Sequence, residues 1–176
     1  MRILVARHGQ TQWNALNKVC GRTDLPLTEL GHAQARELAR KLEHEGIDLI
    51  IASPMIRARQ TAQAVADLCG VEVIVDERLI EQNFGIFEGV DRKDPGFLGN
   101  KRHFALRYPG GESMMDVAHR TYSLLEDIKV KYPDKTVLLA CHGAVGRVIR
   151  TYFEDMTNDE FFHYSPDNAA VMEYEL

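Results

Sequence analysis

Short apolar runs rich in β-branched residues alternate along the chain with longer stretches of helical periodicity. The runs are Ile3–Ala6, Leu49–Ala52, Val71–Val75 and Val137–Cys141, with a weaker one at Ala170–Tyr174. Because each run is short and almost unbroken in its apolarity, we predict strands that are buried on both faces. Strands of this kind are typical of a parallel sheet that is covered by helices.

Helical signals lie between these strands. They are, in chain order, Leu30, Leu38 and Leu42 after Thr28, the N-cap and first-turn pair Ser53-Pro54, the stretch from Ser113 to Ile128, and the residues after Gly143. Strands that alternate with helices predict an α/β fold. We expect a three-layer sandwich with a mostly parallel central sheet and helices on both faces.

The stretch from Gly85 to Gly111 has no sustained period and carries Pro95 and Pro109. We interpret it as an irregular excursion that covers the substrate, not as a linker. A length of 176 residues with 45% hydrophobic residues suits one core. The chain is therefore expected to form a single domain over residues 1–176.

Charge and cysteine content narrow the classes of function. A net charge of −5 argues against nucleic-acid or membrane partners, although a local basic pocket for small anions is compatible with it. Cys20, Cys69 and Cys141 are widely spaced and form no CxxC pair, so no disulfide or zinc framework is indicated. No stretch approaches the length of a membrane span, and we expect a cytoplasmic protein.

Histidines follow two of the predicted strands. Arg7 and His8 end the first strand, and His142 ends another; a glycine follows each histidine. In open α/β sheets, ligands bind beyond the carboxyl ends of the strands. A single histidine at such a place is more often structural, but the repeated pattern favours a site if the two strands are neighbours.

Arginines suggest what such a site binds. Arg7 and Arg57, the latter in the first turns of a helix, carry planar guanidinium groups suited to phosphate. A histidine among arginines can stay neutral and attack phosphorus. The leaving alkoxide then needs a nearby acid, for which Glu77, Glu81 and Glu88 are candidates that spacing alone does not separate.

Six segments together form a more specific pattern. They are "ARHGQTQWN", "GRTDLPLTELGHAQA", "SPMIRARQTA", "LIEQNFGIFEG", "PGGES" and "ACHGAVGR". In this order and spacing they resemble the histidine phosphatase superfamily, the phosphoglycerate mutase-like proteins, and the likeness covers nearly the whole chain. Gln10 and Phe87 stand where that family often has glutamate and tryptophan, and neither difference touches the transfer chemistry.

The resemblance implies roles for individual residues. His8 would be the phosphorylated nucleophile, and Glu81 the proton donor and later the base. The residues that it implies as phosphoryl ligands are Arg7, Arg57, His142 and Asn14. The family needs no metal or cofactor. A zinc site built on His8 and His142 is disfavoured because no third ligand is identifiable.

We therefore expect a phosphomonoesterase that hydrolyses a small phosphorylated metabolite through a phosphohistidine. Two alternatives stay open: a phosphoglycerate mutase-type phosphotransferase, and a phospho-ligand binding module without catalysis. The short chain favours the phosphatase, because mutases of this family resemble a longer branch with extra segments that enclose the site. Water that reaches an open site hydrolyses the intermediate. The presence of both His8 and Glu81 argues against a pure binding module.

Substrate contacts are expected from two further sets of residues. They are Cys20, Gly21, Arg22 and Gly143 near the motifs, and Lys101 and Arg102 in the excursion, where Arg92, His103, Phe97, Phe104 and Tyr108 also occur. The basic members of the excursion are candidates to meet a carboxylate or second phosphate. Sugar phosphates, phosphoglycolytic acids, phosphoserine and α-ribazole phosphate all remain candidate substrates, and a homodimer is left open.

Overall fold

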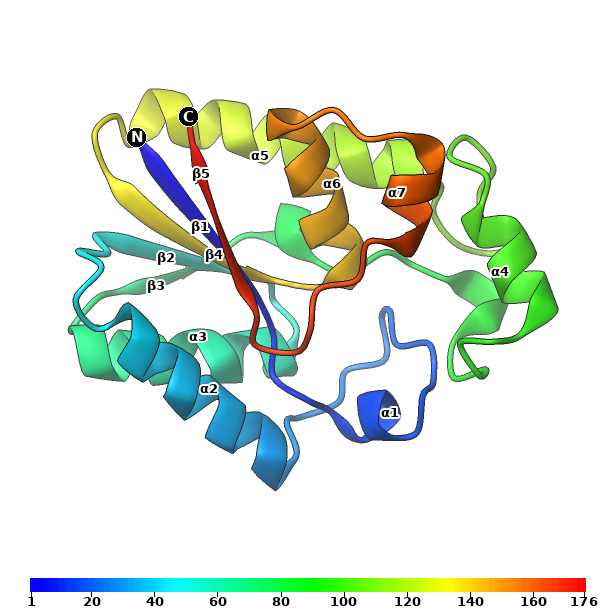
Figure 1. The fold of residues 1–176 in the computed structure, drawn as a ribbon, viewed down its shortest axis with the longest axis horizontal. Helices are drawn as coiled ribbons and strands as arrows, with labels where there is room; N and C mark the ends of the chain where they lie inside the picture. The colour runs from blue at the N-terminus through cyan, green and yellow to red at the C-terminus, as the bar shows by residue number, and fades with distance from the viewer.

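A five-stranded sheet forms the centre of the computed structural model, which describes residues 1–176 (Figure 1). The strands are β1 (Arg2–Arg7), β2 (Leu49–Ala52), β3 (Val73–Val75), β4 (Thr136–Cys141) and β5 (Val171–Glu175). Their order is β3-β2-β4-β1-β5, and only β5 runs antiparallel to its neighbour. The predicted mostly parallel sheet is confirmed.

Helices cover both faces of this sheet, with α2 (Glu29–Leu42) and α3 (Ile56–Cys69) on one side (Figure 1). On the other side lie α5 (Met114–Lys131) and α6 (Gly143–Phe153). Alternate strand residues separate into two cores: Leu4 and Ala6 pack with the first pair of helices, while Ile3 and Val5 pack with the second. The three-layer sandwich is therefore confirmed.

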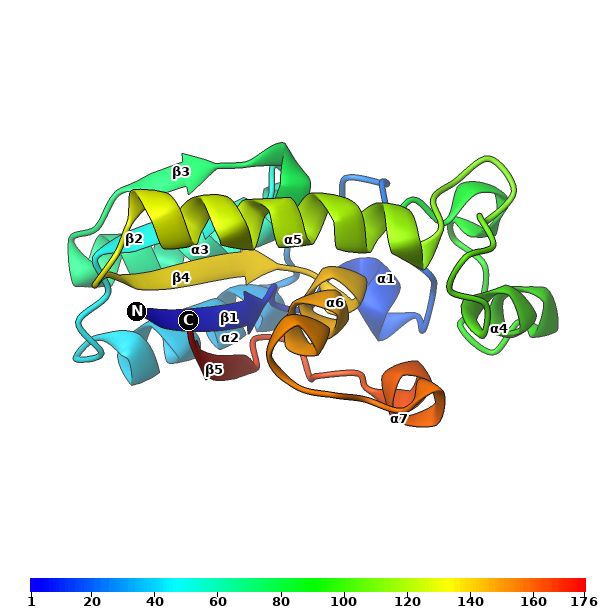
Figure 2. The same cartoon turned by 90° about the horizontal axis from the view of Figure 1, so that it is seen from above.

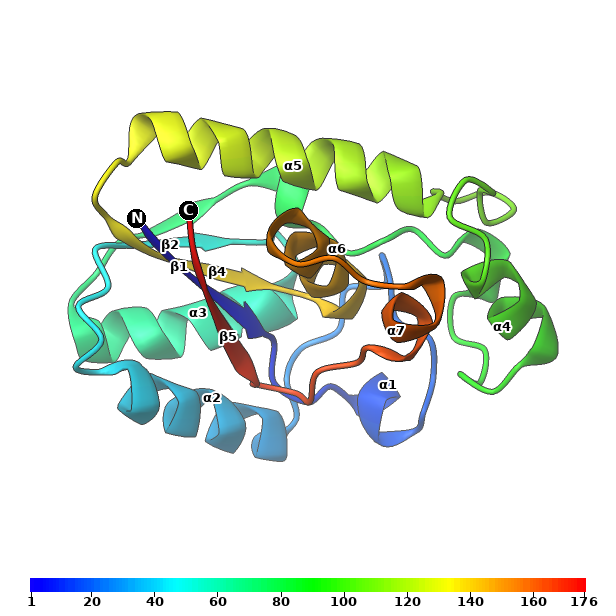
Figure 3. The same ribbon diagram turned by 45° about the horizontal axis from the view of Figure 1, so that its top comes forward.

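The carboxyl ends of the parallel strands lie at the end of the molecule opposite to the two chain termini (Figure 2). Three short helices, α1 (Gln12–Ala15), α4 (Pro95–Lys101) and α7 (Asn158–His163), lie at that end (Figure 3). Two 3₁₀ turns, Glu77–Leu79 and Gly85–Phe87, complete the regular structure. None of the helices combines the length and the apolar composition that crossing a membrane requires.

The predicted start of α3 was wrong. Ser53 and Pro54 are not its N-cap and first residue, because the helix begins at Ile56 after Met55. The Ser53 hydroxyl instead lies 2.7 Å from Nε2 of His142. The amide of Ile56 donates to Asp24 at 2.8 Å, so a residue distant in sequence caps this helix.

The helix expected after Thr28 is present as α2, in which Leu38 and Leu42 are buried and Leu30 is 53% exposed. One further expectation needs correction. The segment 85–111 is not wholly irregular, since it contains α4. Asp94 caps that helix by accepting from the amide of Phe97 at 2.9 Å, and Pro95 occupies its first position.

Two glycines hold the loop after β1 against the start of α2. A Cβ atom on Gly31 would lie 2.1 Å from the carbonyl oxygen of Gln10, and one on Gly9 would lie 2.5 Å from that of Gly31. Both contacts are to backbone, which cannot rotate away. This close approach fixes the path of the chain directly after His8.

Gly31→Ala tests this constraint. We expect the free energy of unfolding to fall by about 1–3 kcal/mol, as overpacking does, because the Gln10 carbonyl must move. Urea unfolding monitored by circular dichroism provides the measurement. Gly99→Ala in α4 is the matched control, since a Cβ there meets nothing within 4 Å. Equal effects of the two substitutions would refute the constraint.

Candidate active site

The two strand-end histidines lie next to each other because β1 and β4 are adjacent parallel strands. Arg7 is paired with Cys141 across the sheet, and the amide of His8 donates to the carbonyl of Cys141 at 3.0 Å. The rings of His8 and His142 are consequently 5.2 Å apart between centroids and inclined by 59°. The chain thus places both imidazoles at one point of the sheet edge.

His8 is buried and neutral. Its Nδ1 lies 2.6 Å from the carbonyl oxygen of Gly9. Since a carbonyl only accepts, Nδ1 carries the proton, and the lone pair is on Nε2, which accepts from Nε of Arg57 at 3.3 Å. Burial, Arg57 and Arg7 lower the pKa of His8 well below 6.5. A neutral imidazole with its lone pair on Nε2 has the form required of a nucleophile.

Arg57 is fully buried in the first turn of α3. Its terminal nitrogens donate to the carbonyls of Gly21 at 2.8 Å and Thr23 at 3.0 Å. The carboxylate of Glu88 in turn accepts from the amides of both Gly21 and Thr23 and from the Thr23 hydroxyl. Glu88 therefore holds the loop that orients Arg57.

Arg7 and His142 each present a buried nitrogen that has no hydrogen-bond partner in the protein. These atoms are Nε of Arg7 and Nδ1 of His142. Ser53 accepts from the amide of Met55 at 3.3 Å, so its hydroxyl proton is free to bond Nε2 of His142. Burial, with Arg57 and His8, lowers the pKa of His142 well below 6.5, so the ring carries one proton. Because Nε2 accepts from the Ser53 hydroxyl, that proton is on Nδ1. Buried donors without a partner are rare and suit a bound oxyanion.

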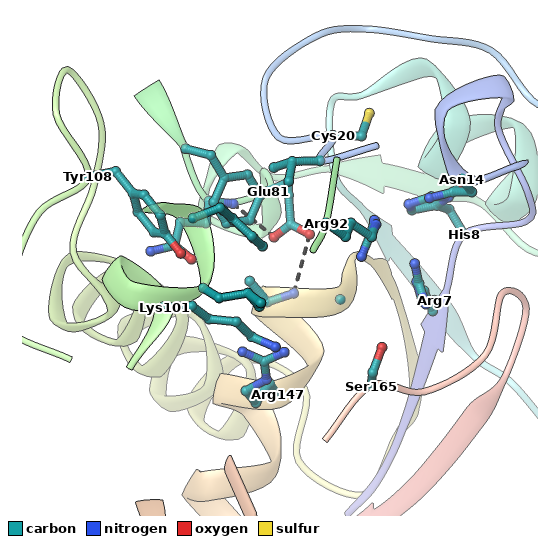
Figure 4. A pocket seen from close by; sticks show the side chains of 17 residues that line it. Arg7, His8, Asn14, Cys20, Glu81, Arg92, Lys101, Tyr108, Arg147 and Ser165 are labelled. Carbon is teal, nitrogen blue, oxygen red and sulfur yellow. Dashed lines mark hydrogen bonds between the residues drawn. The ribbon is translucent and has the colours of Figure 1, made fainter. Parts of the chain in front are cut away.

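Glu81 is the one of the three candidate acids that lines the site. It is 5% exposed, and its carboxylate accepts from the amides of Gln82 at 2.8 Å and Ala144 at 3.2 Å. Figure 4 shows this carboxylate directed into the cavity that His8 also lines. Glu77 is exposed on a 3₁₀ turn. The carboxylate of Glu88 is hydrogen-bonded to Gly21 and Thr23 and does not line the cavity.

The cavity has a volume of about 210 Å³. Its polar lining residues are Arg7, His8, Asn14, Cys20, Glu81, Gln82, Arg92, Lys101, Tyr108, Arg147 and Ser165. Asn14 is oriented by Thr11, whose amide and hydroxyl both donate to its Oδ1 at 2.9 Å. The side-chain nitrogen Nδ2 of Asn14 therefore remains available to donate to a group in the cavity.

Four of the residues expected to contact substrate line the cavity: Asn14, Cys20, Lys101 and Gly143. Three do not. Gly21 contributes its carbonyl to Arg57, and Arg22 binds the carbonyl of Glu81 at 2.8 Å and Glu112 at 3.1 Å.

Arg102 is exposed outside the cavity, with its guanidinium 4.0 Å from the ring centroid of Phe162.

Sequence reasoning assigned no role to Arg147 and Ser165, which both line the cavity. A signal for Arg147 exists: it lies four residues after Gly143 on α6, and helical side chains point back toward the N-terminus. An arginine at that place reaches the sheet edge. Ser165 lies in the segment between α7 and β5, where no pattern marks it.

The comparisons with known proteins agree with this geometry. A family model described as histidine phosphatase superfamily (branch 1) matches residues 3–176. The probable phosphoglycerate mutase GpmB of Enterobacter sp. (strain 638) is 38% identical over 160 residues, covering 86% of this chain and 74% of that protein. The same-named protein of Yersinia pestis (strain Pestoides F) is 34% identical over 159 residues, with the same coverage of 86% and 74%.

Two solved structures share the fold closely. The mycobacterial glucosyl-3-phosphoglycerate phosphatase in complex with VO3 has a TM-score of 0.87 at 30% identity, covering 98% of this chain and 91% of that chain. The phosphoserine phosphatase of Entamoeba histolytica with 3-phosphoglyceric acid has a TM-score of 0.86 at 27% identity, covering 98% and 89%. By its matched residues, its fold and its strand-end histidines, the chain belongs to the histidine phosphatase superfamily.

Proposed function

We propose that this chain hydrolyses phosphomonoesters of small metabolites, with His8 as the nucleophile and Glu81 as the acid and base. The observation that carries the proposal is the neutral, buried imidazole of His8 beside two unpartnered buried donors, Nε of Arg7 and Nδ1 of His142. Such donors match the oxygens of a phosphoryl group, whose charge grows during transfer.

In the first step, Nε2 of His8 attacks phosphorus and the bond to the ester oxygen breaks. Glu81, in its protonated form, gives its proton to the leaving alkoxide. The phosphoryl oxygens accept from Arg7, Arg57 and His142, with Asn14 as a further donor. These contacts stabilise the charge that spreads over the oxygens in the transition state.

In the second step, the Glu81 carboxylate removes a proton from a water molecule, which attacks the phosphohistidine. The bond between phosphorus and Nε2 breaks, inorganic phosphate forms, and His8 returns to its neutral state. Hydrolysis is preferred to transfer because two solved neighbours that cover 98% of this chain are phosphatases by name. The curated relatives named probable phosphoglycerate mutase keep phosphotransfer as the second candidate.

His8→Ala removes the proposed nucleophile. We expect phosphate release to fall by about four orders of magnitude or more, as loss of an enzyme nucleophile does. The wild type, but not the variant, should retain radiolabelled phosphate in acid-labile, base-stable form. His32→Ala, at an exposed position of α2, is the control. Equal labelling of His8→Ala and wild type would overturn the assignment, and formation of 2-phosphoglycerate from 3-phosphoglycerate without phosphate release would favour the mutase.

Glu81→Gln separates the two proposed roles of this carboxylate. With an alkyl phosphate we expect kcat/KM to fall by roughly 10²–10⁴-fold, because the alkoxide leaves without a proton. p-Nitrophenolate needs no proton to leave, so p-nitrophenyl phosphate should give a burst of product and then slow turnover as phosphoenzyme accumulates. Rapid-mixing absorbance measures both phases. The exposed Glu77→Gln is the control; equal losses on both substrates and no burst would contradict the assignment.

The pH dependence follows from the protonation of His8. Because its pKa lies well below 6.5, the nucleophile stays neutral as the pH falls through 6.5, and we expect kcat/KM to show no loss from His8 there. Arg57→Gln removes one cause of the shift and should move the acidic limb to higher pH. Nuclear magnetic resonance titration of His8 in both proteins provides the measurement, and an unmoved pKa would contradict the stated cause.

The same shifts predict how stability changes with pH. His8 and His142 bind protons more weakly folded than unfolded, so the free energy of unfolding should decrease as the pH falls below 6.5. Urea unfolding at a series of pH values measures this slope. A free energy of unfolding that rises on acidification through this range would contradict the buried neutral state of both histidines.

A further inference from the structure

Three cations that phosphoryl transfer does not use also line the cavity. Figure 4 shows Lys101 and Arg147 on the side away from Arg7 and His8, with Arg92 between the two groups. None of these cations has a carboxylate within ion-pair distance, although acidic residues outnumber basic ones by 26 to 21 in the chain. Glu81 is the single carboxylate in the lining.

Backbone carbonyls hold each of the three side chains in place. Nε of Arg92 donates to Lys18 at 3.1 Å, and Nε of Arg147 donates to Tyr164 at 3.1 Å. The ammonium of Lys101 donates to Phe162 at 2.8 Å. These bonds fix the positions of the cations and leave their positive charge without a counter-ion.

Burial and the neighbouring cations both weaken proton binding at Lys101. Burial lowers its pKa to about 8, and Arg147 and Arg92 contribute by repulsion. Arg147 is only 7% exposed. A buried guanidinium without an anionic partner is unfavourable, and a bound anion offsets that cost.

The cavity has more positive charges than a phosphoryl group alone can neutralise. A phosphoryl dianion at His8 is matched by the two positive charges of Arg7 and Arg57. The three remaining cations face only Glu81, which the proposed first step requires to be protonated and therefore uncharged. The far end of the cavity therefore keeps a net positive charge after the phosphoryl group is bound.

We propose that Arg92, Lys101 and Arg147 form a second anion subsite, so that the preferred substrates are small phosphomonoesters with a carboxylate or a second phosphate. This inference rests on the proposed hydrolysis at His8. The cavity volume of about 210 Å³ restricts the substrate to a small molecule that reaches both ends. Apolar side chains of the lining, Phe84, Phe97 and Leu98, contact the carbon skeleton between the two anionic groups.

Pairs of substrates that differ only in the second anion test the subsite. 3-Phosphoglycerate and glycerol 3-phosphate differ by a carboxylate in place of a hydroxymethyl group. Propane-1,3-diol bisphosphate and its monophosphate test a second phosphate. We expect the wild type to favour the doubly anionic member of at least one pair by about tenfold or more in kcat/KM, as a charge-assisted contact supplies. The pair with the larger ratio identifies the anion.

Lys101→Gln and Arg147→Gln should each reduce that ratio by about tenfold, since each removes one charge from the subsite. Lys93→Gln removes the same charge from an exposed place on the segment 85–111 outside the cavity and should leave the ratio as in the wild type. Thermal unfolding of Arg147→Gln establishes that it is folded; Lys101 is half-buried, and its variant carries the test if Arg147→Gln does not fold.

The outcomes separate this inference from the proposed hydrolysis. Hydrolysis of p-nitrophenyl phosphate with no preference within either pair would overturn the subsite and leave the hydrolase intact. If the wild type hydrolyses nothing, calorimetric binding of the same pairs to wild type and to His8→Ala still tests the subsite. Equal affinities within both pairs would then overturn it, and a preference that Lys101→Gln removes would support it.

Discussion

Backbone carbonyls, and not carboxylates, hold the cations of this site. The pairs are Arg7 with Pro166, Arg57 with Gly21 and Thr23, Arg92 with Lys18, Lys101 with Phe162, and Arg147 with Tyr164. A carbonyl dipole fixes a guanidinium or ammonium group without cancelling its charge, whereas a carboxylate would neutralise it. The positive field of the cavity is thus oriented in advance and remains available to an anion, which is the arrangement that electrostatic catalysis requires.

All of these carbonyls come from two segments, the loop 18–23 and the residues 162–166 at and after the end of α7, and the rest of the fold holds those segments in place. Val19 is tied to the segment 85–111 by hydrogen bonds with Gly89 and Val90, while Glu88 holds the next residues of the loop. The chain before β5 is tied to the carbonyl of His8 by Asn168 at 3.0 Å. The sheet places the histidines, and these segments orient the groups around them.

Because the sheet places the histidines while segments outside it orient the other groups, the sequence predicts the first and not the second. Apolar runs and the two histidine-glycine pairs predict the sheet and its functional edge, because strand pairing makes neighbours of residues at the strand ends. Spacing does not separate Glu77, Glu81 and Glu88, since their different directions arise only from tertiary contacts. The capping of α3 by Asp24, and the place of Ser165, depend in the same way on segments without periodicity.

The uncompensated charge has two effects that depend on each other. Burial and the field of Arg57 and Arg7 lower the pKa of His8, so the proposed nucleophile stays neutral in the place where the same field would attract a phosphoryl group. A carboxylate partner for either arginine would weaken the binding of the anion and raise the basicity of the imidazole together. Carbonyl partners neither weaken anion binding nor raise the basicity of the imidazole. They leave the buried cations to repel one another, and a bound anion relieves that repulsion. Binding of a phosphate ester and stabilisation of the fold are therefore coupled through the same side chains.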